Sequence, residues 1–380
     1  MPKDKPEIRF AGYTDAWEKR KLTDVVEKQI KGKAQFEKLK AGDVEYLDTS
    51  RLNGGKAVLT DGVKDVDQDN ILILWDGSKA GTVYTGFEGA LGSTLKAYKT
   101  SADSQFVYQF LKRYQDNIYN NYRTPNIPHV QKDFLDVFNI EVPIFEEQEK
   151  IGILFQNLDH LITVNQRKVD LLKELKKGFL QKMFPKTGED KPEIRFAGYT
   201  DVWEKRPLKK LIKEFSTKSK KENEYKVLSS TNTGMEVRDG RVSGSSNLGY
   251  KIIDDGDLVL SPQNLWLGNI NINNIGTGLV SPSYKTFKFI NVSSLFLKPQ
   301  LRKQRMLEEY KNASTQGASV VRRNLDMNAF YQIEISIPNT FEQKKVGNLF
   351  AALDQLITVN QRRVDLLKQE KKALLQKMFV

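Results

Sequence analysis

Two short segments of the sequence, Asn121–His129 and Ser319–Asn324, carry side chains that can recognise nucleotide bases. Both contain arginine and asparagine, which pair bidentately with the edges of guanine and adenine, respectively. Each segment precedes an alternating stretch that ends in proline, Phe138–Pro143 in one case and Ile333–Pro338 in the other. Because the two segments occupy matching places, together they favour DNA contact more strongly than any single residue does.

The candidate DNA-contacting residues come from these segments, from two glycine- and aromatic-rich stretches and from basic stretches. Lysine and arginine can hold phosphates, and arginine, asparagine and histidine can also reach base edges. Taken singly, each candidate is equally consistent with an ordinary surface side chain. The candidates are Lys79, Tyr84, Arg113, Tyr122, Arg123, Asn126, His129, Arg238, Arg241, Asn264, Trp266, Lys285, Arg322, Arg323 and Asn324.

Few residues are suited to catalysis. The chain has no cysteine and only two histidines, His129 and His160. It contains no Gly-x-Gly-x-x-Gly motif, no phosphate-binding Gly-x-x-x-x-Gly-Lys-Ser/Thr motif and no Asn-Pro-Pro-aromatic motif of adenine methyltransferases. Its acidic residues are scattered and form no repeated pair suited to acid–base or metal chemistry. We therefore expect a protein that is not an enzyme and has no cofactor or metal site of its own.

The charge of the chain is consistent with a polyanionic partner, but it is unevenly distributed. The formal net charge is +12 over 380 residues. Residues 23–143 carry 15 basic and 17 acidic side chains, whereas residues 209–338 carry 19 and 12. Bulk charge therefore favours nucleic acid in the second region only, and a nucleic-acid surface in the first must come from local clustering.

A long repeated segment is the element that must position these regions. Glu147–Phe184 returns as Glu342–Phe379, with 27 of 38 positions identical. Its apolar residues are spaced by three and four, which predicts a helix with a coiled-coil seam, about 57 Å long at 1.5 Å per residue. The second copy has a capping-box pattern at Thr340–Gln343. The simplest cover for each seam is the other copy, so we expect an antiparallel pair about a pseudo-twofold axis.

One asparagine lies at the middle of each predicted seam, Asn165 in the first copy and Asn360 in the second. A seam asparagine lowers stability but fixes the register of a coiled coil. The alternative is an asparagine that faces solvent beside the seam.

A second, shorter repeat precedes each variable region. Lys5–Leu22 returns as Lys191–Leu208 with 16 of 18 positions identical. Its tryptophans, Trp17 and Trp203, are more consistent with packing than with ligand stacking. The sequence after Phe184 resembles the end of the chain joined to its beginning. The chain therefore has the organisation of a circle opened at one of two equivalent joints, and we expect its ends to lie close together.

The two variable regions differ in sequence but share a layout that predicts a mixed α/β fold. Each has an apolar strand after an acidic turn, Asp69–Trp75 or Asp257–Leu260, and each closes with the alternating strand described above. Each also has a basic stretch in a predicted helix, Lys112–Arg113 or Arg302–Arg305. Two domains of one fold with different loops are what the recognition of two different ligands would require.

This alternation resembles the specificity subunits of type I restriction–modification systems. The resemblance covers the whole chain and includes the framework Arg9-Phe10-x-Gly12-x-x-x-x-Trp17 and the helix motif Gln148…Leu158-Asp159-x-Leu161-Ile162. It implies that each variable region recognises one half of a bipartite site in double-stranded DNA. It also implies that the helices set the spacer and dock two methyltransferase subunits, which restriction subunits then join. S-adenosylmethionine and ATP would be bound by those partner subunits.

The expected fold is α+β, with two similar recognition domains separated by two long antiparallel coiled-coil helices in a circular arrangement. The expected bounds are 1–143 and 185–338 for the recognition domains, and 144–184 and 339–380 for the helical spacers. We expect a cytoplasmic protein, because no apolar stretch is long enough to span a membrane. The alternative function is a non-enzymatic coiled-coil scaffold with two protein-binding domains.

Overall fold

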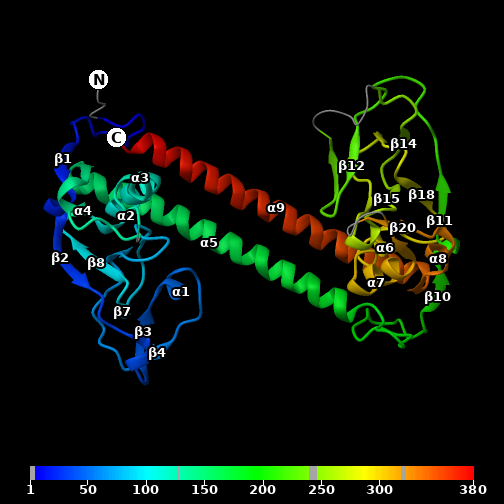
Figure 1. Ribbon diagram of the computed structural model, residues 1–380, viewed down its shortest axis with the longest axis horizontal. Helices are drawn as coiled ribbons and strands as arrows, with labels where there is room; N and C mark the ends of the chain where they lie inside the picture. The colour runs from blue at the N-terminus through cyan, green and yellow to red at the C-terminus, as the bar shows by residue number, and fades with distance from the viewer. Residues whose placement is uncertain (1–4, 127, 239–245, 318–321) are drawn as a thin grey trace. The chain divides into compact units, whose positions relative to one another are not determined.

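The structure is a computed structural model that describes residues 5–126, 128–238, 246–317 and 322–380. It divides into two compact units (Figure 1). Unit 1 comprises residues 1–167 and 361–380, and unit 2 comprises residues 168–360. Both units combine helices and strands, which confirms the α+β prediction. Each unit takes part of both long helices, so this division differs from the predicted domain bounds, which stay a prediction.

Unit 1 contains nine strands among its described residues. They are β1 (Glu18–Lys21), β2 (Val26–Lys31), β3 (Ala41–Leu47), β4 (Leu59–Thr60), β5 (Ile71–Leu74), β6 (Val83–Tyr84), β7 (Ala90–Leu91), β8 (Leu95–Thr100) and β9 (Asn139–Val142). Its short helices are α1 (Thr49–Leu52), α2 (Ser104–Arg113), α3 (Gln115–Asn121) and α4 (Phe134–Val137), with 3-10 turns at Leu22–Val25 and Phe36–Lys38.

Unit 2 follows the same plan. Its strands are β10 (Glu204–Pro207), β11 (Ile212–Phe215), β12 (Leu228–Ser230), β13 (Met235–Val237), β14 (Lys251–Ile253), β15 (Leu258–Leu260), β16 (Ile270–Ile272), β17 (Gly278–Val280), β18 (Lys285–Phe289), β19 (Ser314–Gln316), β20 (Arg323–Leu325) and β21 (Glu334–Ile337). Its short helices are α6 (Ser294–Leu297), α7 (Gln304–Asn312) and α8 (Met327–Gln332), with 3-10 turns at Leu208–Lys210 and Leu265–Leu267.

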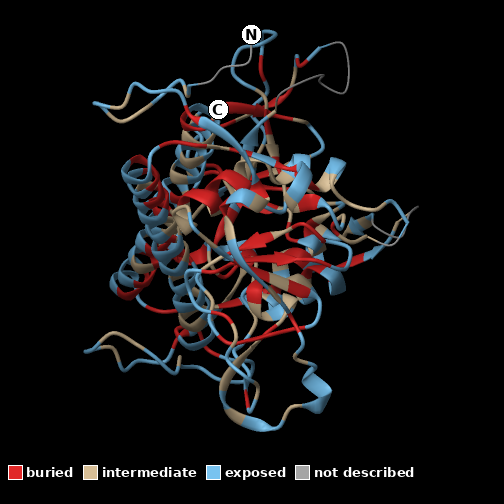
Figure 2. Cartoon of the chain, turned by 90° about the vertical axis from the view of Figure 1, so that its left-hand side faces the viewer, coloured by how far each residue is buried: buried red, intermediate tan, exposed pale blue. Residues whose placement is uncertain are grey.

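A four-stranded antiparallel sheet forms the centre of each unit. Its order is β2-β8-β5-β6 in unit 1 and β11-β18-β15-β16 in unit 2. The predicted apolar strands are β5 and β15, and every residue of both is buried. In unit 1 two hydrophobic clusters use alternate residues of β5, so this strand is covered on both faces. Figure 2 shows buried residues running through the strands.

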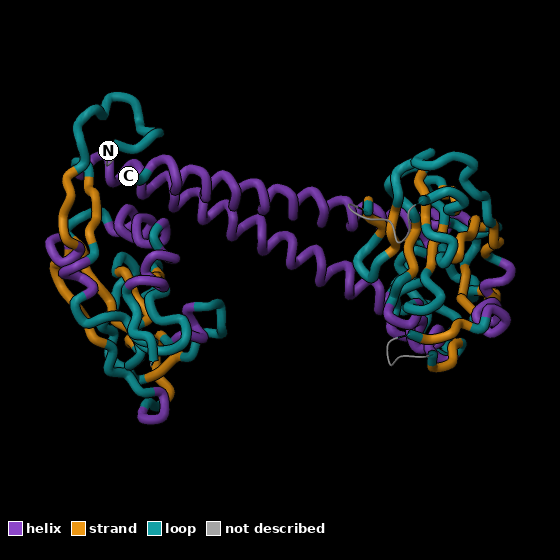
Figure 3. The backbone as a smooth tube through the Cα atoms, turned by 45° about the horizontal axis from the view of Figure 1, so that its top comes forward, coloured by secondary structure: helices purple, strands orange, loops and turns teal. Residues whose placement is uncertain are grey.

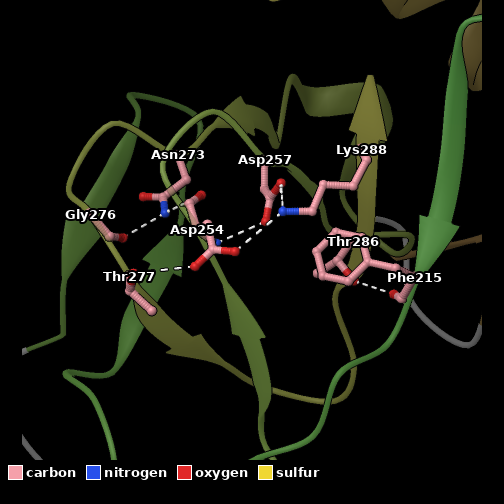
Figure 4. A network of polar contacts seen from close by, with 8 residues as sticks. All are labelled: Phe215, Asp254, Asp257, Asn273, Gly276, Thr277, Thr286 and Lys288. Carbon is pink, nitrogen blue, oxygen red and sulfur yellow. Dashed lines mark hydrogen bonds and ion pairs between the residues drawn. The ribbon is translucent and has the colours of Figure 1, made fainter. Parts of the chain in front are cut away.

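The predicted acidic turns close the loop that precedes each central strand. In unit 2 the Asp257 carboxylate accepts the Asp254 backbone N–H at 2.8 Å, and it lies 2.7 Å from the Lys288 ammonium (Figure 4). In unit 1 the Asn70 side chain accepts the Asp67 backbone N–H in the same way, at 3.2 Å. An amide and a carboxylate therefore fill one structural position, and the carboxylate has a lysine partner.

The predicted long helices are present as α5 (Phe145–Lys182) and α9 (Thr340–Met378), shown as purple tubes in Figure 3. The predicted capping box is wrong, because Asn339 rather than Thr340 caps α9 and accepts the Glu342 backbone N–H at 3.0 Å. The predicted basic helix of unit 2 is wrong in part, since α7 begins at Gln304 and Arg302 precedes it.

The two long helices run antiparallel within each unit. In unit 1 Phe155 packs against Phe379, and Asp159 pairs with Lys371. In unit 2 Lys176 of α5 pairs with Asp354 of α9. Phe184, just beyond the end of α5, packs against Phe350, which is nearer the start of α9. The contact position on one helix therefore rises as that on the other falls, which confirms the predicted direction.

The seam asparagines are buried, so the alternative in which they face solvent is wrong. Asn165 is 8 % exposed and Asn360 is 7 % exposed. Each donates from its side-chain amide to the carbonyl four residues earlier in its own helix, Leu161 or Leu356, at 2.7 Å. Their proposed effect on register stays a prediction.

Both joints of the circular organisation are present. In unit 1 the Ile8 N–H donates to the Lys377 carbonyl at 3.0 Å, and in unit 2 the Ile194 N–H donates to Lys182 at 2.9 Å. The expected closeness of the chain's ends is thus confirmed for Ile8 and Lys377. Trp17 is buried against Phe106 and Phe379, and Trp203 makes matching contacts in unit 2, which confirms their packing role.

Candidate nucleic-acid interface

In unit 1 the first candidate segment is a loop fastened to the turn that follows the central strand β5. The loop closes through a bridge between Arg123 and Val130. Its backbone then joins the turn: Gly77 N–H donates to the Pro128 carbonyl at 2.9 Å, and Val130 N–H donates to Trp75 at 2.9 Å. The loop and the turn therefore form one backbone surface, which we call the unit 1 loop pair (residues 75–81 and the described part of residues 122–131).

Unit 2 has the same arrangement with a different loop. Strands β19 and β20 form an antiparallel hairpin in the matching place, between α7 and α8. The Arg323 N–H donates to the carbonyl of Gln263, which lies in the turn after the central strand β15. The unit 2 loop pair is therefore the described part of residues 261–268 and 314–325. The structure thus brings together, twice, the segments that the sequence singled out.

Two of the predicted arginines hold these loops in place through hydrogen bonds. The Arg123 guanidinium donates to the Tyr119 carbonyl at 2.8 Å and to the Ser78 carbonyl at 3.1 Å. The Arg323 guanidinium donates to the hydroxyl and the carbonyl of Ser314, at 2.8 and 2.7 Å. Each side chain joins the loop to a neighbouring element, so its first role in this structure is to fix the loop.

Other candidates of the loop pairs lie at the surface. Lys79 and Asn126 are exposed in unit 1, and Arg322 and Asn324 are exposed in unit 2. His129 is half-buried, and its Nδ1 lies 3.0 Å from the Thr124 hydroxyl, within the loop. The exposed asparagines and Arg322 are the side chains whose chemistry suits base edges.

Several candidate aromatic and amide side chains pack inside the units. Tyr84 is 9 % exposed in the core of unit 1, and Tyr122 packs against Phe134 and Phe138. Trp266 packs against the core of unit 2, and Asn264 stands at the start of the 3-10 turn Leu265–Leu267. These side chains therefore make their contacts within their own units.

The remaining basic candidates differ in their surroundings. The Lys285 ammonium lies 2.7 Å from the Glu214 carboxylate, and the Arg113 guanidinium lies over the Tyr114 ring. Arg238 is half-buried beyond β13, and its backbone N–H donates to Val227. Arg241 lies outside the described residues.

Buried polar contacts that the sequence analysis missed fasten the short repeat to the long helices. Arg9 pairs with Glu147 through two nitrogens, at 2.7 and 2.8 Å, and Arg195 pairs with Glu342 at 2.6 and 2.8 Å. Both glutamates are fully buried, and hydrogen bonding to Glu147 raises the pKa of Arg9 despite its desolvation. The sequence does contain a signal for these ion pairs, because Arg9 returns as Arg195 in the short repeat and Glu147 returns as Glu342 in the long repeat.

A three-residue junction also fixes each variable region to the helices. In unit 1 the Asp159 carboxylate accepts from Lys371 of α9 and from Gln109 of α2, at 2.6 and 2.9 Å. In unit 2 Asp354 lies between Lys176 of α5 and Lys298, which follows α6. The long helices supply equivalent residues in both junctions, whereas the third residue differs.

Close packing against the variable region explains the glycine near the start of each long helix. A Cβ atom on Gly152 would lie 2.3 Å from the Asp103 carboxylate, and one on Gly347 would lie 2.9 Å from the Phe296 backbone nitrogen. The helix start therefore packs directly on the beginning of α2 or α6. Gln148 and Gln343 complete this contact by accepting backbone N–H groups of Asp103 and Ser293.

Two kinds of feature are absent from the described residues. They contain no cluster of three histidine or acidic side chains that could hold a metal ion. None of their helices is both long and apolar enough to cross a membrane.

The two units share one fold, and each has a loop pair of the same construction with different side chains. Residues 14–174 match the family described as the type I restriction modification DNA specificity domain. The chain is 25 % identical over 395 residues to the MjaVIII type I restriction enzyme specificity subunit of Methanocaldococcus jannaschii, covering 94 % of this chain and 91 % of that one. It is 22 % identical over 306 residues to the putative MjaX specificity subunit of the same organism, covering 74 % and 68 %.

The fold agrees with these sequence matches. The crystal structure of the S subunit of a type I restriction-modification system from M. genitalium superposes with a TM-score of 0.70 at 16 % identity, covering 99 % of both chains. In sequence and in fold, the chain is thus similar to the specificity subunits of type I restriction–modification systems. Its function is DNA specificity within such a system, with DNA and other subunits of the system as partners. The relatives that match are specificity subunits, which are the non-catalytic part, and this match confirms the prediction that this chain is not an enzyme.

Proposed function

We propose that this specificity subunit recognises a bipartite DNA site, one half through each loop pair. Residues 1–143 and 185–338 are the two target recognition domains in this proposal. The observation that carries it is the twofold occurrence of one backbone construction, a loop joined to the turn after the central strand, with dissimilar exposed side chains. Equal scaffolds with unequal contacts are what two different half-sites require.

Within each loop pair the division of labour follows from exposure. Arg123 and Arg323 hold the loops, so the base contacts fall to the exposed Asn126 of unit 1 and to Arg322 and Asn324 of unit 2. Lys79 and Arg238 contact phosphates, which position the duplex but carry no sequence information. Lys285 contributes less, because Glu214 already offsets its charge.

The long helices set the length of the unread spacer and dock two methyltransferase subunits. The support for docking is an apolar stripe that both helices leave exposed at equivalent positions of the repeat. Its side chains are 42–71 % exposed: Leu161, Val164 and Leu171 on α5, and Leu356, Val359 and Leu366 on α9. Their spacing of three and seven places them on one side of each helix, away from the buried seam positions.

In this proposal the cofactors of the system belong to the partner subunits. S-adenosylmethionine is bound by the methyltransferase subunits, and ATP by restriction subunits that join the complex. The complex acts on chromosomal or incoming DNA in the cytoplasm.

The direct test is to map methylated bases in cells that express the full-length chain with its partner subunits, by long-read sequencing. We expect one methylated motif with two different half-sites and a constant spacer. Asn126→Ala should relax one half only, and Asn324→Ala the other. Glu174→Gln, at another exposed position on α5, is the control. A uniform loss of methylation at all sites in either loop variant would assign that residue to general binding rather than base recognition.

A further inference from the structure

Two lysines of unit 1 face each other across neighbouring strands, close to the loop pair. Lys31 ends β2, Lys96 stands near the start of β8, and the two are direct cross-strand partners. Opposed residues of an antiparallel pair have Cβ atoms about 4.5–5.5 Å apart, and like charges so placed destabilise a sheet. Neither lysine forms an ion pair with any residue that the structure describes.

The position of Lys96 is fixed by the residue that also anchors the loop pair. The Lys96 ammonium lies over the Trp75 ring, 3.1 Å from its centroid. The Trp75 backbone donates to Thr94 beside β8 at 2.8 Å and accepts from Val130 of the loop at 2.9 Å. One residue therefore connects the lysine pair to the candidate DNA-contacting loop.

The surroundings of Lys96 disfavour the charged form of its side chain. Partial burial lowers the pKa of the Lys96 ammonium, the neighbouring Lys31 lowers it further, and Asp76 opposes both effects. The strand position equivalent to Lys96 in unit 2 is Lys285, because Ile73 and Leu260 are the matching partners on the central strands. Lys285 has a carboxylate partner in Glu214, whereas Lys96 forms no ion pair with a carboxylate in the described part of the chain.

Protection of an exposed sheet edge explains only part of this arrangement. β2 is an edge strand, and lysines on edge strands discourage pairing with other chains. β8, however, is an inner strand, so that explanation covers Lys31 and leaves Lys96 without one. A charge held against an indole face, opposite another unpaired charge, is suited to an anionic ligand that enters from solvent.

We propose that Lys31 and Lys96 form a phosphate-binding site for the backbone of duplex DNA, beside the unit 1 loop pair. The inference rests on the proposed function and deepens it. It also supplies the local clustering that unit 1 needs, because residues 23–143 carry a net negative charge. Lys79, in the turn that follows Trp75, extends the same basic surface. Unit 1 thus binds the duplex through a few placed lysines rather than through bulk charge.

The same two strands provide a matched control. Lys28 and Lys99 are also direct cross-strand partners on β2 and β8, and both are exposed. They lie three residues from Lys31 and Lys96, so they project from the opposite face of the sheet. Lys28→Ala with Lys99→Ala therefore removes equal charge from the same strands without touching the proposed site.

The experiment measures the salt dependence of binding to a random-sequence duplex, with the full-length chain in the complex in which it is isolated. Removal of one phosphate contact lowers the slope of log affinity against log salt by about 0.9. We expect Lys31→Ala with Lys96→Ala to lower the slope by about 1.8, and the control pair to leave it unchanged. Lys31→Gln with Lys96→Met keeps the aliphatic cover over Trp75 and should give the same decrease, which guards against misfolding of the alanine variant.

The outcomes separate this inference from the proposed function. An unchanged slope in both Lys31/Lys96 variants, or an equal decrease in the Lys28/Lys99 control, would overturn the phosphate site while leaving DNA recognition intact. Absence of duplex binding by the unaltered complex would instead remove the proposed function. Retention of the methylated motif in the Lys31/Lys96 variants, with weaker binding at all sequences, would support backbone contact.

Discussion

The two units share almost every contact of their framework and almost none of their exposed recognition chemistry. Arg9 with Glu147 and Arg195 with Glu342 are the same buried ion pair, and Trp17 and Trp203 pack in the same aromatic cluster. The loop pairs, by contrast, expose Lys79 and Asn126 in one unit and Arg322 and Asn324 in the other. The difference separates residues that build the shared framework from residues that, in the proposed function, distinguish the two half-sites.

The comparison also shows how one structural task can be performed by different residues. Asp159 is held by Lys371 and Gln109, whereas Asp354 is held by two lysines, Lys176 and Lys298. The long helices contribute the constant aspartate and lysine, and the variable region contributes the third partner. Sequence divergence within a variable region is therefore tolerated where the partner atom remains a donor.

The largest expected effect on stability comes from breaking one of the matched buried ion pairs. Arg9→Ala leaves the fully buried Glu147 without its partner, which should lower the free energy of unfolding by about 3–5 kcal/mol. Arg195→Ala should have the same effect through Glu342. Hydrogen exchange resolved along the chain should show loss of protection in unit 1 for the first variant and in unit 2 for the second. Equal loss throughout the chain in both variants would contradict the independence of the two frameworks.

Next in size is the loss of complex formation when the exposed apolar stripe is made charged. Leu171→Glu with Leu366→Glu should abolish co-purification of the methyltransferase subunits, because these side chains are 71 % and 64 % exposed and have no structural need to be apolar. The melting temperature of the isolated chain should change little. Glu174→Lys with Glu370→Lys is the control, since it alters charge at other exposed positions of the same helices. Undiminished co-purification would contradict docking on this stripe.

Base recognition should show an intermediate effect that is confined to one half-site. Loss of a bidentate contact costs about 1–3 kcal/mol of discrimination at one base pair. Asn324→Ala should therefore relax one position in the half-site recognised by unit 2, and Asn126→Ala one position in the other. Quantitative methylation of single-base variants of the motif measures both. Relaxation in both halves by one substitution would contradict the assignment of one loop pair to each half.

The smallest expected effect concerns the turn that precedes each central strand. Asn70 already closes this turn in unit 1. Asp257→Asn in unit 2 keeps an acceptor for the Asp254 N–H and should therefore lower the free energy of unfolding by less than Asp257→Ala does. Asp257→Ala removes the acceptor of the Asp254 N–H and should cost about 1–3 kcal/mol. Thermal or denaturant unfolding of the two Asp257 variants measures both changes in free energy. A similar cost for both substitutions would show that the charge, rather than the acceptor, is what unit 2 requires.

Much of the fold followed from periodicity and repetition. The spacing of apolar residues predicted both long helices to within two residues at each end, and alternation predicted β9 and β21. The short strands β12 to β14 were not predicted, because three-residue strands carry too little pattern. The cap at Asn339 was missed because Thr340 fits the capping-box pattern equally well, and only the backbone conformation distinguishes them.

The candidate site was predicted at the level of segments rather than side chains. Residue type alone predicted Arg123 and Arg323 as base contacts. In the structure the Arg123 guanidinium donates to the distant Ser78 carbonyl, and the Arg323 guanidinium donates to the Ser314 carbonyl across a hairpin. Lys31 and Lys96 were not singled out, because their opposition depends on strand register, which the sequence does not specify. Tertiary contacts decided each of these roles.

The central claim, that one framework carries two independent recognition surfaces, is tested most directly by duplication. A chain in which residues 209–338 are replaced by a second copy of residues 23–143, expressed with the partner subunits, should methylate a palindromic motif built from one repeated half-site. Hydrogen exchange would establish that the duplicated region is folded. A folded chain that still methylates two different half-sites would contradict the account.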